Sequence, residues 1–156
     1  LTKASSPMPV LLILMGLAFN LVNGSLHGAW LFVHPLISDS QWLGGWPFIA
    51  GAVMFAGGMA LNIDSSRRLL RLKKANPDDY SIPRGGLFRW VSCPNYLGEI
   101  VEWLGWALLT WSPAGLAFAA WTMANLVPRA RAHHRWYRER FSDYPTKRKA
   151  LVPGLF

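Results

Sequence analysis

The sequence predicts an all-α membrane protein, a bundle of helices that crosses the bilayer several times. No Asp, Glu, Lys or Arg occurs from Ala4 to Val33 or from Ser40 to Ile63, and each stretch exceeds the ~20 residues that a helix needs to cross a bilayer. In addition, the 16 basic residues fall only in those parts of the chain that four crossings would place on one side. The positive-inside rule makes that side cytoplasmic.

Four spans are expected in chain order. The first runs from Met8 to Val33 and the second from Leu43 to Ile63. The short loop between them, residues 34–41, contains Pro, Ser and Asp but no basic residue. Two shorter apolar runs follow, Tyr96 to Trp111 and Leu116 to Val127, separated by a Ser-Pro-Ala-Gly turn at residues 112–115. We expect these two runs to form a hairpin.

The basic residues lie before, between and after these spans. One precedes the first span, seven lie in a polar connector from Asp64 to Arg89, and eight follow the fourth span. The net charge of +8 alone would suit nucleic acid, anionic lipid or a phosphorylated small molecule. Because the cations are sorted between apolar segments, we expect membrane lipid and no nucleic acid as partner. The single cysteine, Cys93, excludes a disulfide within the chain.

Three polar side chains recur on one face of the first span. Asn20, Asn23 and His27 are spaced i, i+3 and i+7, which places them on one side of a helix. Such residues hold helices together through hydrogen bonds inside a bundle, or they line a ligand-binding site within the membrane. The residues alone leave both interpretations open.

The third span begins with polar and aromatic residues at helical spacing: Asn95, Glu99, Glu102, Trp103 and Trp106. One interpretation places the carboxylates at the headgroup level, paired with Arg or Lys of the connector. The other is that Glu99 and Asn95 offer hydrogen-bonding groups to an amide or hydroxyl of a bound ligand.

After the fourth span, arginines alternate with imidazole and aromatic side chains from Arg129 to Tyr137. Each arginine would gain about 1 kcal/mol near anionic lipid, and planar bidentate donors among aromatic rings also suit phosphate and nucleobase recognition. His133 and His134 are adjacent and point about 100° apart, so we expect no metal site. No GxGxxG motif follows a strand, which argues against a Rossmann domain.

Four segments together carry a family resemblance. They are Leu61-Asn62-Ile63, the IPRGGLF sequence at 82–88, the NYLGEIVEW sequence at 95–103, and residues 143–153. In this order they resemble the C-terminal part of the steroid 5α-reductases (3-oxo-5α-steroid 4-dehydrogenases). The resemblance covers nearly the whole chain. It implies one membrane-embedded reductase domain over residues 1–156, with about four spans of a seven-helix fold and the first helices expected before Leu1.

The resemblance implies NADPH-dependent reduction of the Δ4 double bond of a 3-oxosteroid or other apolar enone, with hydride transfer to C5 and a 5α-reduced product. In that family a Glu and a Tyr polarise the 3-oxo group. Both match positions before the start of this sequence, so we expect the catalytic pair to precede Leu1.

The resemblance also implies a cofactor site. Family positions that hold or surround NADPH correspond in this chain to Asn62, Tyr80, Asn95, Glu99, Arg129, His133 and Tyr137. Four further cations are expected to pair with its phosphates, because bidentate and ammonium donors suit them: Arg71, Lys73, Arg84 and Arg148. We expect a substrate pocket walled by Asn20, Asn23, His27, Trp103 and Trp106.

One departure from the family concerns the residues after Asn62. The mammalian enzymes have a His and then an Asp at the two later polar positions, whereas this chain has Ile63-Asp64-Ser65-Ser66. Asp64 is our candidate replacement for one of these contacts to the cofactor.

Other functions fit parts of the sequence. Isoprenylcysteine-type methyltransferases, which use S-adenosylmethionine, share a similar C-terminal layout but usually have Arg-His-Pro before the Tyr, where this chain has Cys93-Pro94-Asn95. Related sterol and enoyl reductases would keep NADPH and change the substrate. A non-enzymatic membrane scaffold would use the basic surface for lipid only, and it would have no use for Asn62 or Glu99.

Overall fold

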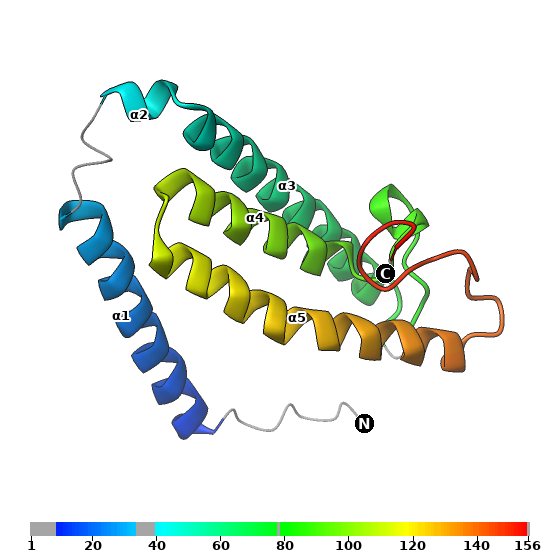
Figure 1. Cartoon of the computed structure of the whole chain (residues 1–156). Helices are drawn as coiled ribbons and strands as arrows, with labels where there is room; N and C mark the ends of the chain where they lie inside the picture. Colours follow the sequence, from blue (N-terminus) through cyan, green and yellow to red (C-terminus); the bar gives the residue numbers. More distant parts are fainter. Residues whose placement is uncertain (1–8, 34–39, 78, 156) are drawn as a thin grey trace.

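A computed structural model describes residues 9–33, 40–77 and 79–155, and it confirms the all-α prediction for these residues. The helices are α1 (Val10–Val33), α2 (Ser40–Gly44), α3 (Trp46–Ala75), the 3-10 helix η2 (Gly86–Arg89), α4 (Pro94–Thr110) and α5 (Pro113–Arg140). Helices α3, α4 and α5 lie side by side, and α1 runs at an angle to α5 (Figure 1). Met8 and residues 34–39 of the expected loop lie outside the described residues.

Two of the described helices, α1 and α3, are long and apolar enough to cross a membrane. They correspond to the first two expected spans. The third and fourth runs form α4 and α5, which pack against each other as the predicted hairpin. These two do not meet the same test of length and composition.

Helices α3 and α5 both continue beyond the segments predicted as spans. α3 runs past Ile63 to Ala75, so five of the seven basic residues of the predicted polar connector belong to this helix. α5 runs past Val127 and through Pro128 to Arg140. The change to polar composition therefore does not mark the ends of these helices.

Four glycines allow α3 and α4 to pack backbone against backbone. Gly51 and Gly58 on α3 are seven residues apart, as are Gly98 and Gly105 on α4, which puts each pair on one face. A Cβ atom on Gly58 would lie 2.4 Å from the backbone nitrogen of Glu102, and one on Gly105 would lie 2.4 Å from that of Phe55. Close approach through small residues is how membrane helices commonly associate.

The turn between α4 and α5 is held by buried hydroxyls. Trp111 ends α4 in the left-handed region, with φ 46°, and Ser112 caps α5 by accepting a hydrogen bond from the Gly115 amide at 2.8 Å. The Ser112 hydroxyl also lies 2.8 Å from the Thr110 hydroxyl. These bonds fix the geometry of the hairpin.

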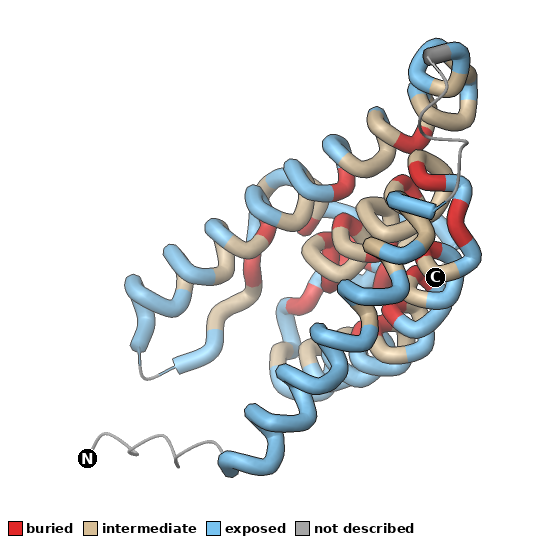
Figure 2. The backbone as a smooth tube through the Cα atoms, turned by 90° about the vertical axis from the view of Figure 1, so that its left-hand side faces the viewer, coloured by how far each residue is buried: buried red, intermediate tan, exposed pale blue. Residues whose placement is uncertain are grey.

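Helix α1 has no buried residue, and Figure 2 shows it exposed along most of its length. It touches the hairpin through aromatic and polar contacts: the Trp30 indole donates to the Thr110 carbonyl at 3.3 Å, and the Phe19 ring lies 6.0 Å from that of Phe118. Its apolar outer surface is what a helix facing lipid or further helices presents.

After α5, residues 141–155 fold back onto the start of α4. We call this segment the strap. Its backbone is hydrogen-bonded to the residues just before α4: the Ser92 amide donates to the Lys149 carbonyl at 2.8 Å, and the Lys149 amide donates to the Trp90 carbonyl at 2.8 Å. Leu151 of the strap joins the buried core with Cys93 and with residues of α4 and α5. The strap thus ties the end of α5 to the beginning of α4.

Candidate functional site

The basic ends of α3 and α5 and the beginning of α4 come together at one end of the molecule, with the strap beside them (Figure 1). At this end the backbone of Asn62 lies against α4, because a Cβ atom on Gly98 would be 2.6 Å from the backbone nitrogen of Asn62. The Asn62 side-chain oxygen accepts a hydrogen bond from Ser66 at 3.1 Å. Glu99 follows Gly98 directly and Asn95 precedes it by three residues, and both are half-buried. The structure therefore brings a predicted residue of α3 next to the predicted pair on α4.

Helix α5 contributes the next two predicted residues to the same place. The Tyr96 hydroxyl lies 3.4 Å from His133 Nε2, and the Arg129 charge lies close enough to Glu99 for a direct electrostatic interaction. Because Arg129 and His133 are one turn apart, both face the first turns of α4. A half-buried carboxyl group at this position can exchange hydrogen bonds with a ligand amide.

A second group of predicted residues lines a pocket of about 450 Å³ between the end of α3, the connector and α5. Lys73, Tyr80 and Tyr137 are among the residues that line it. Burial raises the pKa of Tyr137 to about 12, so its hydroxyl stays protonated and can donate a hydrogen bond at neutral pH. An ammonium group and two phenols around one pocket suit a phosphorylated aromatic ligand.

The other predicted cofactor residues differ in their surroundings. Arg71 is exposed, Arg84 forms an exposed ion pair with Asp143 at 3.5 Å, and Asp64 pairs with Arg68 at 2.7 Å. Arg148 is buried, and its Nε atom has no hydrogen-bond partner among the described residues.

Arg148 carries a buried charge without a carboxylate partner in the part of the chain that the structure describes. Buried charges in proteins are normally paired, and no carboxylate of the described residues forms an ion pair with this guanidinium. The guanidinium donates to the Tyr144 hydroxyl at 3.5 Å, and its central carbon lies 4.9 Å from the centroid of the Tyr144 ring. A buried guanidinium in this state fits a site that an anionic group completes.

The predicted substrate residues are brought together in part. The Trp106 indole donates to His27 Nδ1 at 3.1 Å, and the ring of Phe118 lies 4.2 Å from that of Trp103 and 6.3 Å from that of His27. Thus His27 bridges α1 and α4. Asn20 does not join this cluster, because it is exposed and donates to the Gly16 carbonyl of its own helix at 2.9 Å, and Asn23 is half-buried on α1.

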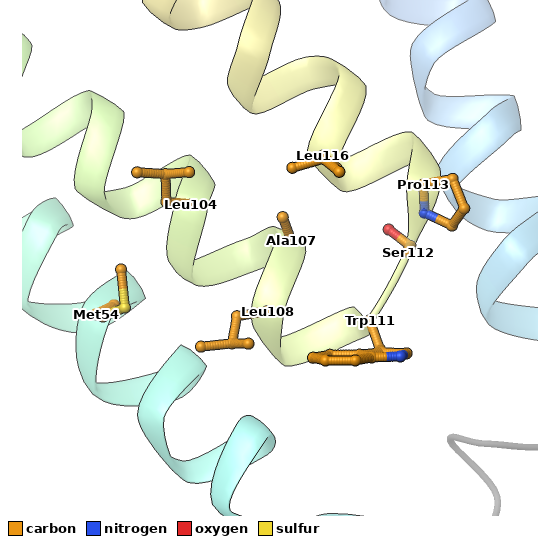
Figure 3. A pocket seen from close by; sticks show the side chains of 8 residues that line it. All are labelled: Met54, Leu104, Ala107, Leu108, Trp111, Ser112, Pro113 and Leu116. Carbon is orange, nitrogen blue, oxygen red and sulfur yellow. The ribbon is translucent and has the colours of Figure 1, made fainter.

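A larger apolar pocket, of about 520 Å³, lies at the opposite end of the hairpin (Figure 3). It is lined by Met54, Leu104, Ala107, Leu108, Trp111, Ser112, Pro113 and Leu116. None of the predicted substrate residues lines it, so sequence reasoning did not locate it.

The family model described as 3-oxo-5-alpha-steroid 4-dehydrogenase matches residues 6–156. The chain belongs to this family. Among curated proteins, steroid 5-alpha-reductase DET2 of Arabidopsis thaliana is 47% identical over 95% of this chain and 57% of its own length. Human 3-oxo-5-alpha-steroid 4-dehydrogenase 2 is 45% identical over 100% of this chain and 61% of its own length. The chain spans about three fifths of the length of these steroid 5-alpha-reductase relatives.

Several residues next to this site were not singled out from the sequence. Ser92 is buried between His134 and Tyr144, with its hydroxyl 2.6 Å from His134 Nδ1 and 2.7 Å from the Tyr144 hydroxyl. Tyr144 lies in the Asp-Tyr-Pro segment that contributed to the family resemblance, but the sequence predicted no role for this residue. Phe118, which joins the substrate cluster, had no such signal.

Proposed function

We propose that this chain carries the NADPH site of a membrane steroid 5α-reductase, and that the whole protein reduces the Δ4 double bond of 3-oxosteroids. Hydride would pass to C5 and give a 5α-reduced product. The observation that supports this best is that Asn62 of α3 and Arg129 of α5 both approach the first turns of α4, where Glu99 lies. Family membership and the names of the relatives point the same way.

The residues fit the chemical groups of NADPH. Asn95 and Glu99 offer both donors and acceptors, which an amide such as the nicotinamide carboxamide requires. Lys73 and the unpaired Arg148 supply cations for phosphate groups, and Tyr80 and Tyr137 supply aromatic faces. NADPH when bound supplies the hydride. The chain's own residues bind and orient it and keep water from the apolar side of the site.

We further propose that α4 and α5 cross the membrane as a third and fourth span, so that the basic ends of α3 and α5 share the cytoplasmic side. NADPH would then enter from the cytoplasm, while a steroid reaches the site through the bilayer. The aromatic cluster around Phe118, with His27, Trp103 and Trp106, would form part of the substrate wall, and Asn20 and Asn23 would extend it along α1.

Two cations and one acid have a more peripheral part in this proposal. Arg71 and Arg84 are exposed and would attract phosphate groups at the entrance. Asp64 would reach the cofactor ribose or adenine, if binding exchanges its bond to Arg68 for one to the ligand.

The test uses the purified full-length protein. NADPH oxidation is followed with a Δ4-3-oxosteroid, and methyl transfer from S-adenosylmethionine is measured in parallel. We expect a 5α-reduced product and no methylated one. A methylated product without steroid reduction would establish the methyltransferase alternative, and reduction of a different enone would point to a related sterol or enoyl reductase.

The role of Glu99 is tested by Glu99→Ala, with Glu139→Ala on the exposed face of α5 as the matched control. Loss of a hydrogen bond to a charged group corresponds to about a tenfold to hundredfold loss, so NADPH-dependent turnover should fall by that factor in Glu99→Ala only. Normal turnover in this variant would remove Glu99 from the site, whereas a lipid-binding scaffold predicts no NADPH-dependent turnover in the wild type either.

A further inference from the structure

The Ser92 hydroxyl is a buried node that joins α5 to the strap. It lies 2.6 Å from His134 Nδ1, 2.7 Å from the Tyr144 hydroxyl and 3.1 Å from the Lys149 carbonyl oxygen. Ser92 precedes α4, His134 belongs to α5, and Tyr144 and Lys149 belong to the strap. Three parts of the chain that lie far apart in the sequence therefore share one oxygen atom.

The directions of these bonds follow from the groups involved. A serine hydroxyl has one hydrogen and two lone pairs. The Lys149 carbonyl can only accept, so Ser92 donates to it, and the lone pairs accept from the Tyr144 hydroxyl and from His134 Nδ1–H. The Tyr144 oxygen in turn accepts from Arg148 at 3.5 Å. Every hydrogen-bonding position of the Ser92 hydroxyl is thus used, and such networks hold one conformation.

The node fixes a ring that supports the proposed cofactor pocket. Tyr144 is buried, and its ring is stacked on that of Tyr137 with centroids 5.4 Å apart and an interplanar angle of 12°. Tyr137 in turn lines the pocket that also contains Lys73 and Tyr80. A parallel stack prevents the Tyr137 ring from tilting, and the hydroxyl bond to Ser92 prevents Tyr144 from sliding out of the stack.

We propose that Ser92 and Tyr144 are positioning residues for the nicotinamide cofactor. Through them the strap holds the Tyr137 ring in the orientation that the cofactor requires and links it to the start of α4, which bears Asn95 and Glu99. Neither positioning residue touches the cofactor. This inference rests on the proposed NADPH site.

The experiment measures NADPH affinity directly, by tryptophan fluorescence on the full-length protein, together with the KM for steroid at saturating NADPH. Ser92→Ala and Tyr144→Phe each remove one partner of the same hydrogen bond, and Tyr144→Phe keeps the stacked ring. Each should raise the Kd for NADPH about fivefold and leave the KM for steroid unchanged. Tyr144→Leu, which also removes the stack, should raise the Kd further.

A double variant and a control separate positioning from loss of fold. Because the two substitutions share the Ser92–Tyr144 bond, Ser92→Ala combined with Tyr144→Phe should weaken NADPH binding by less than the product of the two single effects. Ser142→Ala, an exposed serine of the strap, should bind as the wild type does. All measurements are made well below the thermal midpoint of each variant, and Tyr144→Phe decides the question if Ser92→Ala does not fold.

The two proposals fail in different ways. If Tyr144→Phe binds NADPH as tightly as the wild type and only its thermal midpoint falls, the strap has a structural role alone and the inference is overturned. If the wild-type protein itself does not bind NADPH, the proposed function is overturned, and the inference with it.

Discussion

Replacing Gly58 by alanine tests how closely α3 and α4 pack. The new Cβ would lie 2.4 Å from the Glu102 nitrogen and 2.6 Å from the Gly98 oxygen, against 3.4 Å or more for an ordinary contact. These are backbone atoms that cannot rotate away, so the helices would have to separate by about 1 Å. Overpacking of this kind costs about 1–3 kcal/mol, and we expect the upper part of that range, about 2–3 kcal/mol.

The neighbouring residue provides the control. Gly57 is also in the interior of α3, but a Cβ there meets nothing within 4 Å. Both substitutions gain the same helix propensity, roughly 1 kcal/mol, so this term cancels when the variants are compared. At about 2–4 °C per kcal/mol for a chain of this size, the thermal midpoint of Gly58→Ala should lie about 4–12 °C below that of Gly57→Ala.

The assay is thermal unfolding in detergent, followed by the intrinsic fluorescence of the tryptophans, of which this chain has nine. Because Asn62 is one turn beyond Gly58 and lies against Gly98, Gly58→Ala should also weaken NADPH binding. Equal midpoints for Gly57→Ala and Gly58→Ala would show that the two helices are not in backbone contact and would refute the packing that positions Asn62.

Three further predictions concern the basic end. Burial, and to a smaller extent nearby cations, lower the pKa of His134 below 6.5. The unfolded chain therefore binds the proton more readily than the folded one, so stability should fall as the pH drops below about 6.5. The thermal midpoint of His134→Asn should depend less on pH over this range. Cys93 is buried and its pKa is raised to about 12, so at pH 8 an alkylating reagent followed by peptide mass spectrometry should modify it far more slowly in the native than in the unfolded protein. The Arg84–Asp143 pair is exposed, and Asp143→Asn should lower the free energy of unfolding, measured by denaturant titration, by less than ~1 kcal/mol.

The helices were largely predictable because uncharged stretches of this length have few alternatives to a buried or membrane-spanning helix. The helix ends were not. Residues 64–75 are mostly Arg, Lys, Leu and Ala, which favour a helix as strongly as the apolar residues before them, and only Pro77 follows as a breaker. Pro128, which commonly ends a helix, is accommodated within α5.

The site was predictable to the extent that it lies on continuous segments. The NYLGEIVEW sequence contains Asn95 and Glu99 together, and the resemblance assigned them to the cofactor. Contacts between distant segments could not be predicted, because a single sequence does not show which helices pack against each other. The seven-residue glycine spacing is visible on both helices once their partnership is known, and the bond between Ser92 and Tyr144 joins residues 52 positions apart.

The lengths of the helices suggest how one site can serve a charged cofactor and an apolar substrate. The 30 residues of α3 span about 45 Å, and the hydrocarbon layer is only about 30 Å thick. If α3 and α5 cross the membrane as proposed, the last ten or so residues of α3 project beyond the hydrocarbon, and the end of α5, with 28 residues, projects similarly. Asn62 lies near the point where α3 leaves the hydrocarbon, and Lys73 lies about 16 Å further along the helix. In the proposed function, the nicotinamide would bind near the first and the phosphates near the second, so that hydride is delivered at the edge of the membrane while the charges remain in water.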